Sequence, residues 1–440
     1  KSQLALHGGP KAVQSDPGDL FKWPIVTPED EEAVLDVLRR GAMSGTDVTV
    51  KFEEEFAAWQ GAKYALACNN GTSALQSALY GCEIGVGDEI ICPSLTYWAS
   101  ALPVLSLGAS VVFADIDPNT LCIEPNDIEH RISPHTRAIV VVHYLGHPAE
   151  MDPIMAIARR HGLKVIEDVS HAQGGLYKGR KLGTIGDVAG MSLMSGKSFA
   201  IGEGGILVTD DRAIYERALA FGHYERYDER ITTPSLRPYR NLPLGGYKYR
   251  IHQMSSAMGR VQLKQYDQRV GEIRRAMNYF WDLLDGVPGL QAHRVNEEGY
   301  NTMAGWYAPH GLYQPAELGG LSITRFAAAV QAEGGVCSPG LNKPLHIHPL
   351  LTEADIYGHD RPTRIAQAQR DLIGEQGSLP VAETIGKLTY SIPWFKHYRP
   401  EQIAEYANAF RKVAENYAEL LAEDPGDPPE LTSWPSLQRA

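Results

Sequence analysis

A single lysine, Lys197, stands between two apolar stretches, where a charged side chain needs a reason. The apolar run Val188–Met194 precedes it, and the turn Gly202–Gly205 and a second apolar run, Ile206–Val208, follow it. Short apolar runs bounded by glycines indicate buried strands, and lysine is rarely buried in such surroundings unless it is paired. A lysine amine held in a protein site can form a Schiff base with a carbonyl group. Lys197 is therefore a candidate for covalent carbonyl chemistry.

The stretch "NNGTSALQSAL" directly follows the expected strand Tyr64–Cys68. Gly71 lets the backbone turn closely, and Thr72 opens a helix whose free N–H groups favour a phosphate. A Gly-Thr pair at a helix start is also ordinary N-capping, so this motif alone leaves both interpretations open.

Two further strand ends carry polar or aromatic groups. Tyr97 follows the expected strand Glu89–Cys92 in "PSLTYWAS", where aromatic rings either stack on a planar ligand or pack in the core. Asp168 and His171 follow Leu163–Glu167 in "DVSHAQGG". Because open parallel sheets bind ligands beyond the carboxyl ends of their strands, these groups should share one site.

Taken in order, the strand ends supply a phosphate cradle, an aromatic plate, a carboxylate and a lysine. This combination suits pyridoxal phosphate. The lysine would form the Schiff base, and the carboxylate would keep the pyridine nitrogen protonated so that the ring accepts electrons.

The elements that position these groups alternate along the first two thirds of the chain. Strands are expected over Tyr64–Cys68, Glu89–Cys92, Ser110–Asp115, Ala138–His143, Leu163–Glu167, Val188–Met194 and Gly205–Thr209. Helix-like stretches lie between several of them, at Thr72–Tyr80, Trp98–Leu107, Pro125–Ile132 and Asp152–His161. The alternation predicts an α/β fold with a mostly parallel seven-stranded sheet flanked by helices.

After Gly246 the pattern becomes helical, with apolar residues at helical spacing over Ser255–Val287. We expect a large α/β domain with an N-terminal arm, residues 1–254, and a connecting helix with a smaller C-terminal α+β domain, residues 255–440. An amphipathic helix is expected over Pro400–Leu421, followed by a proline-rich tail that is extended or mobile. A chain of 440 residues exceeds what one hydrophobic core usually fills, which agrees with two domains.

Composition argues against several classes of partner. The net charge of −12 argues against a nucleic-acid or anionic-membrane surface, and no apolar run reaches the roughly 20 residues of a membrane span. The 5 cysteines form no metal-binding spacing, and their apolar context predicts buried, reduced thiols in a cytoplasmic protein. The two histidines of "KPLHIHPLL" lack a third ligand at a recognisable spacing, so we expect no metal site.

Four ordered blocks resemble one enzyme family. The blocks "CNNGTSAL", "CPSLTYWAS", "IEDVSHAQGG" and "SLMSGKSFAIGEGGILVTDD" together are similar to the DegT/DnrJ/EryC1/StrS family, and the similarity runs from about Leu4 to about His348. Members are fold-type-I, pyridoxal-phosphate-dependent aminotransferases that act on keto sugars and keto cyclitols. The resemblance implies the same fold, cofactor and activity here.

The resemblance also implies roles for individual residues. Lys197 falls on the Schiff-base lysine, Asp168 on the pyridinium carboxylate, and His171 on the residue near the hydroxyl of the cofactor ring. The phosphate-binding residues and the aromatic that covers the ring fall on Gly71, Thr72, Ser192 and Tyr97.

One position departs from the family's commonest pattern. Relatives often have "GYNYRM", whose asparagine reaches the cofactor phosphate of the neighbouring subunit, whereas "GYKYRI" places Lys248 in that slot. Lys248 would either contact the phosphate or point to solvent. The match implies a homodimer with shared active sites, and the long, aperiodic segment Tyr224–Tyr249, rich in Tyr and Arg, is typical of an interface. His346 and Arg250 are expected to border the substrate.

The function that follows is amino transfer from glutamate or glutamine to a keto sugar or keto cyclitol, in amino-sugar or aminocyclitol biosynthesis of the antibiotic type. Lys197, displaced from the Schiff base, is suited to move the substrate proton. A dehydratase of the same fold is an alternative, but such relatives carry histidine in place of the lysine. A non-catalytic regulatory homologue is another, against which the intact site residues argue. The sequence leaves open whether the ketone is a free cyclitol, a sugar phosphate or a nucleotide sugar.

Overall fold

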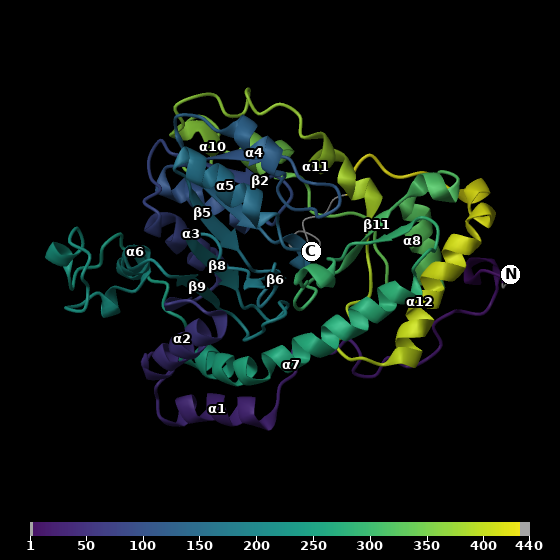
Figure 1. Cartoon of the computed structure of the whole chain (residues 1–440), viewed down its shortest axis with the longest axis horizontal. Helices are drawn as coiled ribbons and strands as arrows, with labels where there is room; N and C mark the ends of the chain where they lie inside the picture. The colour runs from purple at the N-terminus through teal and green to yellow at the C-terminus, as the bar shows by residue number, and fades with distance from the viewer. Residues whose placement is uncertain (1–2, 432–440) are drawn as a thin grey trace.

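A seven-stranded sheet forms the centre of the molecule (Figure 1), in a computed structural model that describes residues 3–431. From one edge to the other the strands are β1 (Tyr64–Cys68), β9 (Gly205–Thr209), β8 (Val188–Ser192), β5 (Lys164–Asp168), β4 (Thr136–Val142), β2 (Glu89–Pro93) and β3 (Ser110–Ala114). Strand β9 runs antiparallel to β1 and β8, and the other described pairs run parallel. The predicted mostly parallel seven-stranded sheet is confirmed.

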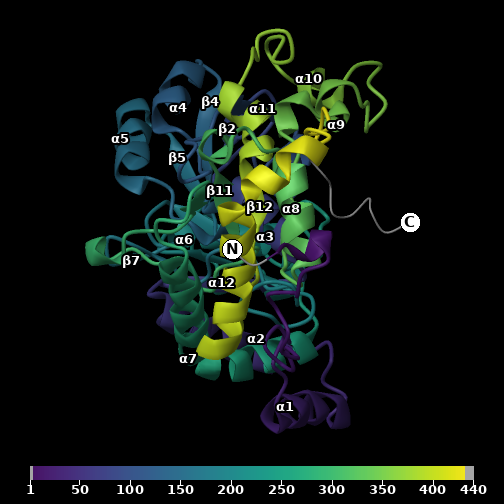
Figure 2. The ribbon, with the colours of Figure 1, turned by 90° about the vertical axis from the view of Figure 1, so that its right-hand side faces the viewer.

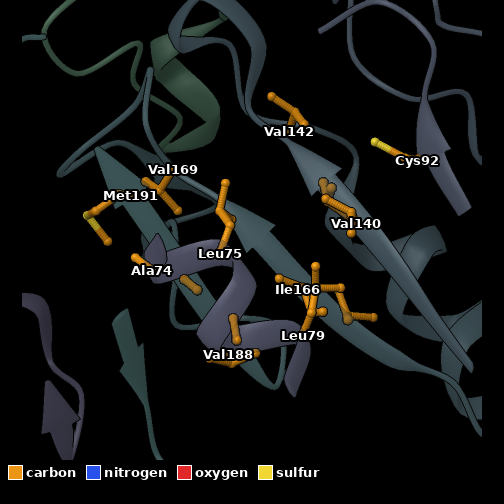
Figure 3. Close-up of a cluster of buried hydrophobic side chains, with 14 of the residues drawn as sticks. Ala74, Leu75, Leu79, Cys92, Val140, Val142, Ile166, Val169, Val188 and Met191 are labelled. Carbon is orange, nitrogen blue, oxygen red and sulfur yellow. The ribbon is translucent and has the colours of Figure 1, made fainter. Parts of the chain in front are cut away.

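The sheet is parallel and covered because its strands are apolar on both faces. Every residue of β2, β3 and β9 is buried, as expected when helices lie on both sides of a parallel sheet. Helix α3 (Gly71–Gly81) lies across β8 and β5 with Ala74, Leu75 and Leu79 turned toward the strands (Figure 3). Each fully buried leucine contributes about 1.5–3 kcal/mol to folding, so this packing fixes the N-terminus of α3 against the end of β8.

Four further helices of this part of the chain surround the sheet: α2 (Asp47–Gln60), α4 (Pro125–Arg131), α5 (Met151–His161) and α6 (Arg212–Gly222). Helix α1 (Pro28–Arg39) instead packs on α7 (Gln253–Leu283) (Figure 1), and β6 (Leu176–Tyr177) and β7 (Arg180–Lys181) form a separate two-stranded sheet. The prediction of one helix over Trp98–Leu107 is wrong: two 3₁₀ helices, Trp98–Ser100 and Leu102–Leu107, occupy it. Pro103 explains the difference, because proline inside an α-helix removes a hydrogen bond and clashes with the preceding turn.

Helix α7 (Gln253–Leu283) connects the sheet to a second, smaller body (Figure 1). This body contains the antiparallel strands β10 (Leu290–Ala292), β11 (His310–Tyr313) and β12 (Thr389–Ser391), covered by α8 (Ile323–Ala332) and α12 (Pro400–Glu415). Both long helices expected from the sequence are present, and each ends earlier than predicted.

The described residues form two large hydrophobic cores and a small third one of Val37, Val48 and Ala257. The short helices α9 (Pro349–Thr352), α10 (Thr363–Ala366) and α11 (Pro380–Thr384) follow α8 in the chain, of which α10 contacts β3, and residues from Leu341 to Ile385 contribute to the core of the large sheet. Leu4 and Leu20 of the N-terminal arm belong to the second core, and the arm lies beside α8 (Figure 2). The division of the chain at residues 254/255 stays a prediction.

Four further features relate to what the sequence predicts. The loop Tyr224–Tyr249 projects beyond α6 (Figure 1) and contains the 3₁₀ helices Tyr224–Arg226 and Arg237–Tyr239. The cysteines are buried and unpaired, as predicted. Asp424 and Asp427 of the proline-rich tail accept hydrogen bonds at the start of α8, and the tail's last residues, 432–440, lie outside the described residues. None of the helices formed by residues 3–431 is long and apolar enough to cross a membrane.

Candidate active site

A cavity of about 840 Å³ opens at the carboxyl ends of the sheet strands. Seven of the residues expected to bind the cofactor line it, namely Gly71, Thr72, Tyr97, Asp168, His171, Ser192 and Lys197. The loops at Tyr307–His310 and Ser338–Asn342 close it from the side of the smaller body. Residues distant in sequence therefore meet in one cavity.

The N-terminus of α3 forms one end of the cavity. Asn70 caps the helix by accepting a hydrogen bond from the Ser73 N–H at 2.8 Å. The N–H groups of Gly71 and Thr72 find no hydrogen-bond acceptor among the described residues, so they remain available to an anion. A side chain at position 71 would place its Cβ 2.6 Å from the Cβ of Ser192. Glycine is therefore what lets the two amides and the Ser192 hydroxyl converge.

Asp168 ends β5 and is only 5% exposed. One carboxylate oxygen accepts from the Ser100 hydroxyl at 2.7 Å, and the other accepts from the Ser170 N–H at 3.0 Å. Thr96 lies 2.8 Å from the Ser100 hydroxyl and extends this network. The carboxylate is thus held rigidly at the cavity wall, as a group that must bind a ring nitrogen requires.

His171 is neutral in this environment. Burial, and next the nearby Lys197, hold the pKa of His171 well below its usual range. Its Nδ1 accepts a hydrogen bond from the Leu145 N–H at 3.1 Å. Since Nδ1 accepts, the proton of the neutral ring is on Nε2, which makes Nε2 a hydrogen-bond donor.

Lys197 is buried, with 8% of its surface exposed. Its amine lies 4.0 Å from the centroid of the Tyr307 ring, and the same ring lies 4.4 Å from that of His171. A cation over an aromatic face gains about 0.5–2 kcal/mol, the higher values when it is desolvated. Tyr307 therefore contacts both groups at this end of the cavity.

The loop that presents Tyr307 has an unusual backbone. Ala304, Trp306 and Ala308 have φ angles of 51°, 55° and 45°, in the left-handed region that costs L-residues about 1–2 kcal/mol each. Between them, a Cβ at Gly305 would lie 2.2 Å from the Cβ of Ser198, the neighbour of Lys197. Strain of this kind persists where surrounding structure enforces it, and it clusters at functional sites.

Three residues expected at the site lie elsewhere in the single chain. Lys248 is exposed, with its amine 6.0 Å from the Tyr224 ring, and Arg250 pairs through its backbone with Cys68. His346 is buried between Ser94, 2.6 Å from its Nδ1, and Glu383, 2.8 Å from its Nε2. None of these three lines the cavity formed by the described residues. Their roles stay predictions.

Sequence reasoning missed Ser100 and Tyr307. Ser100 lies inside the block "CPSLTYWAS", so a search for a donor to Asp168 among the quoted blocks could have found it. Tyr307 is more than a hundred residues from Lys197 in a segment without strand or helix periodicity, and no pattern marks it. Residues 3–431 bring no three His, Cys, Asp or Glu side chains together in a way that could hold a metal ion.

The arrangement fits pyridoxal phosphate. Gly71 and Ser192 lie so close together that a Cβ at position 71 would fill the space between them. The backbone amides and the Ser192 hydroxyl at this end of the cavity, the Gly71–Ser192 cradle, can bind a phosphate. The fixed Asp168 carboxylate suits a protonated ring nitrogen, and the Lys197 amine suits a covalent bond to an aldehyde. Tyr97 lines the same cavity and stays 38% exposed, so its face is open to a planar ring.

Comparison with known proteins agrees with this fit. The model of the DegT/DnrJ/EryC1/StrS aminotransferase family matches residues 24–411. An L-glutamine:2-deoxy-scyllo-inosose aminotransferase from Streptomyces kanamyceticus is 32% identical over 439 residues, which cover 96% of this chain and 99% of that protein. A GDP-perosamine synthase from Caulobacter vibrioides is 41% identical over 303 residues, covering 68% of this chain and 77% of that protein. The crystal structure of an aminotransferase from Psychrobacter cryohalolentis is 28% identical, with a TM-score of 0.76 over 90% of this chain and 99% of that one.

Proposed function

Because the chain belongs to the DegT/DnrJ/EryC1/StrS aminotransferase family, we propose that it transfers an amino group from glutamate or glutamine to a keto sugar or keto cyclitol. Membership makes it a pyridoxal-phosphate-dependent aminotransferase. The observation that carries the proposal is the convergence of Lys197, Asp168 and the Gly71–Ser192 cradle in one cavity. Matches to one enzyme named for an inosose and to another named for a nucleotide sugar support either acceptor class.

Each residue has a distinct task in this proposal. When bound, pyridoxal phosphate supplies an electron sink that lets an amino group pass between an amino acid and a ketone. Gly71, Thr72 and Ser192 hold the phosphate, and Asp168 holds the proton on the ring nitrogen. Lys197 binds the cofactor covalently through Nζ and, when released, moves the substrate proton.

His171 donates its Nε2–H toward the cofactor ring's hydroxyl in the same proposal. Its low pKa keeps it neutral, so this donor role persists across the physiological pH range. Tyr97 covers the ring from the open side of the cavity.

The identity of the ketone that the protein aminates distinguishes the two substrate classes. We expect the purified protein, given glutamine or glutamate, to aminate at least one ketone from a panel of free inososes and 4-keto nucleotide sugars. Product formation followed by mass spectrometry checks the activity, and the Lys197→Ala variant serves as the blank. Holoenzyme that carries the cofactor yet aminates none of these ketones with either donor would contradict the proposed substrates.

We also propose that the enzyme is a homodimer in which Lys248 reaches the partner's cofactor phosphate. Lys197 is the sole lysine or arginine among the described residues that line the cavity, so the phosphate end lacks a cation from its own chain. Lys248 is exposed on the loop that projects beyond α6.

A subunit-mixing experiment tests the shared site. Lys248→Ala is expected to weaken cofactor retention, because it removes a charge-assisted contact to the phosphate. A hybrid of a Lys248→Ala subunit and a Lys197→Ala subunit then has one intact site and one doubly altered site. At a limiting cofactor concentration, where the Lys248→Ala homodimer is inactive, random exchange of equal amounts should restore about a quarter of the wild-type activity, since half of the dimers are hybrids with one active site each.

The same experiment has clear contrary outcomes. Hybrids that recover no activity, although tagged subunits demonstrably exchange, would argue against the shared site. A monomer by light scattering at micromolar concentration would exclude the homodimer itself.

A further inference from the structure

Lys197 and four other residues form a closed series of contacts. The Trp23 indole N–H donates to the Lys197 carbonyl oxygen at 2.8 Å. The amine of Lys396 lies 5.3 Å from the centroid of the Trp23 ring and 2.7 Å from that of Trp394. Trp394 meets the Tyr307 ring edge-on at 5.7 Å and 88°, and Tyr307 returns to the Lys197 amine.

The series draws on four separate segments of the chain. Trp23 belongs to the N-terminal arm, Trp394 and Lys396 follow β12 in the smaller body, and Tyr307 lies on the loop with left-handed residues. Trp394 also donates its indole N–H to the Gly305 carbonyl at 2.8 Å, two residues before Tyr307. One indole therefore holds the backbone of Lys197, and the other holds the loop that contacts its amine.

Lys396 lies at the centre of this arrangement, where burial of its amine costs free energy. It is 4% exposed, and burial lowers the pKa of its amine from 10.5 to about 6. The charged groups on its own and adjoining segments pair elsewhere, because His397, next to Lys396 in the chain, lies 3.8 Å from Asp19 and 3.3 Å from Glu272. An apolar residue of the same length would fill this space without the desolvation of an amine.

We propose that Lys396 is a positioning residue of the active site, which fixes Lys197 from two sides through the indoles of Trp23 and Trp394. Because its pKa is lowered, the amine is uncharged at neutral pH, and it gives the two indole faces a common N–H donor. The proposal rests on the role of Lys197 proposed above, and it adds the residue that sets the placement of that lysine. Lys396 itself does not line the cavity and does not touch the substrate.

The alternative is that Lys396 only fills space in the core. The Lys396→Met variant distinguishes this packing role from the positioning role. A lysine whose folded pKa is lowered makes the protein lose stability as the pH falls from 10.5 toward about 6. Lys396→Met removes this loss, so its melting temperature at pH 7 should equal or exceed that of the wild type. If Lys396 only packs, the variant should also work normally. If it positions Lys197, function should fall while stability does not.

The test uses the full-length holoenzyme. For Lys396→Met we expect kcat to fall ten- to about a hundredfold, the size of effect of a small misplacement of a catalytic group, with KM for the ketone unchanged within about twofold. The visible absorbance of the bound cofactor, which reports the proton on Lys197 Nζ, should shift its pH midpoint by about half a unit or more. Trp23→Phe, which keeps an aromatic face but loses the N–H to the Lys197 carbonyl, should shift the midpoint too.

A second buried lysine provides the matched control. Lys412 lies in the same body and donates to Glu333 at 2.8 Å. Lys412→Met breaks a buried ion pair, so it should lower the melting temperature and leave the absorbance midpoint unchanged. Wild-type kcat and midpoint in both Lys396→Met and Trp23→Phe would overturn the positioning role. A wild-type protein without any cofactor absorbance would instead overturn the proposed function.

Discussion

Replacing Lys197 with alanine should abolish turnover and the visible absorbance of the bound cofactor together, while the protein stays folded. Lys197 is the residue whose amine reaches into the cavity, and no other lysine or arginine of the described residues lines it. The variant therefore loses both the covalent attachment and the group that moves the proton. We expect turnover to fall by at least about a thousandfold, and stability to fall by about 1 kcal/mol through loss of the contact with Tyr307.

Lys181 supplies the matched control for this variant. Its amine also lies 4.0 Å from an aromatic centroid, that of Trp59, but Lys181 is on β7 and outside the cavity. Lys181→Ala should lose a similar contact and keep both activity and absorbance. Product formation measures turnover, and the change of absorbance on borohydride reduction reports the covalent bond between lysine and cofactor. Turnover at the wild-type rate in Lys197→Ala would refute the assignment of the lysine.

The parts of the site that the sequence predicts are those encoded by local patterns. The strands β1 and β9 have the bounds expected from the sequence, because burial on both faces leaves an apolar run that marks each strand. Lys197, Asp168 and Gly71 stand directly at the ends of such runs, so predicting the strands also places these residues at one edge of the sheet. The cavity confirms that they meet.

The parts that the sequence does not predict depend on contacts between distant segments. Tyr307 reaches Lys197 because three residues around it adopt left-handed backbone that no residue type there favours. Trp23 reaches the Lys197 carbonyl from the N-terminal arm, and Lys396 contacts Trp23 from near the other end of the chain. Tertiary packing decides such contacts, and periodicity has no means of indicating them. His346 is held between Ser94 and Glu383, and its expected role beside the substrate stays a prediction.

Replacing Asp168 with asparagine should leave cofactor binding largely intact and remove most of the activity. The amide oxygen can still accept a hydrogen bond from Ser100 or Ser170, and the Ser100 hydroxyl can rotate to accept from the amide nitrogen. An amide has no charge to keep the ring nitrogen protonated, so the electron sink is weakened. We expect kcat to fall on the order of a hundred- to a thousandfold, as when other charge-stabilising groups are removed.

Asp187→Asn separates this effect from the loss of a hydrogen-bonded carboxylate in general. Asp187 accepts from the Val165 N–H at 2.8 Å at the opposite end of β5 and pairs with Lys164, so its replacement should affect stability and leave kcat alone. Cofactor occupancy by absorbance and kcat by product formation are compared across both variants. If Asp168→Asn loses less than about tenfold in kcat, equivalent to ~1.4 kcal/mol, then Asp168 is a structural residue, its bonds to Ser100 and Ser170 are its main role, and the carboxylate that serves the ring nitrogen lies elsewhere.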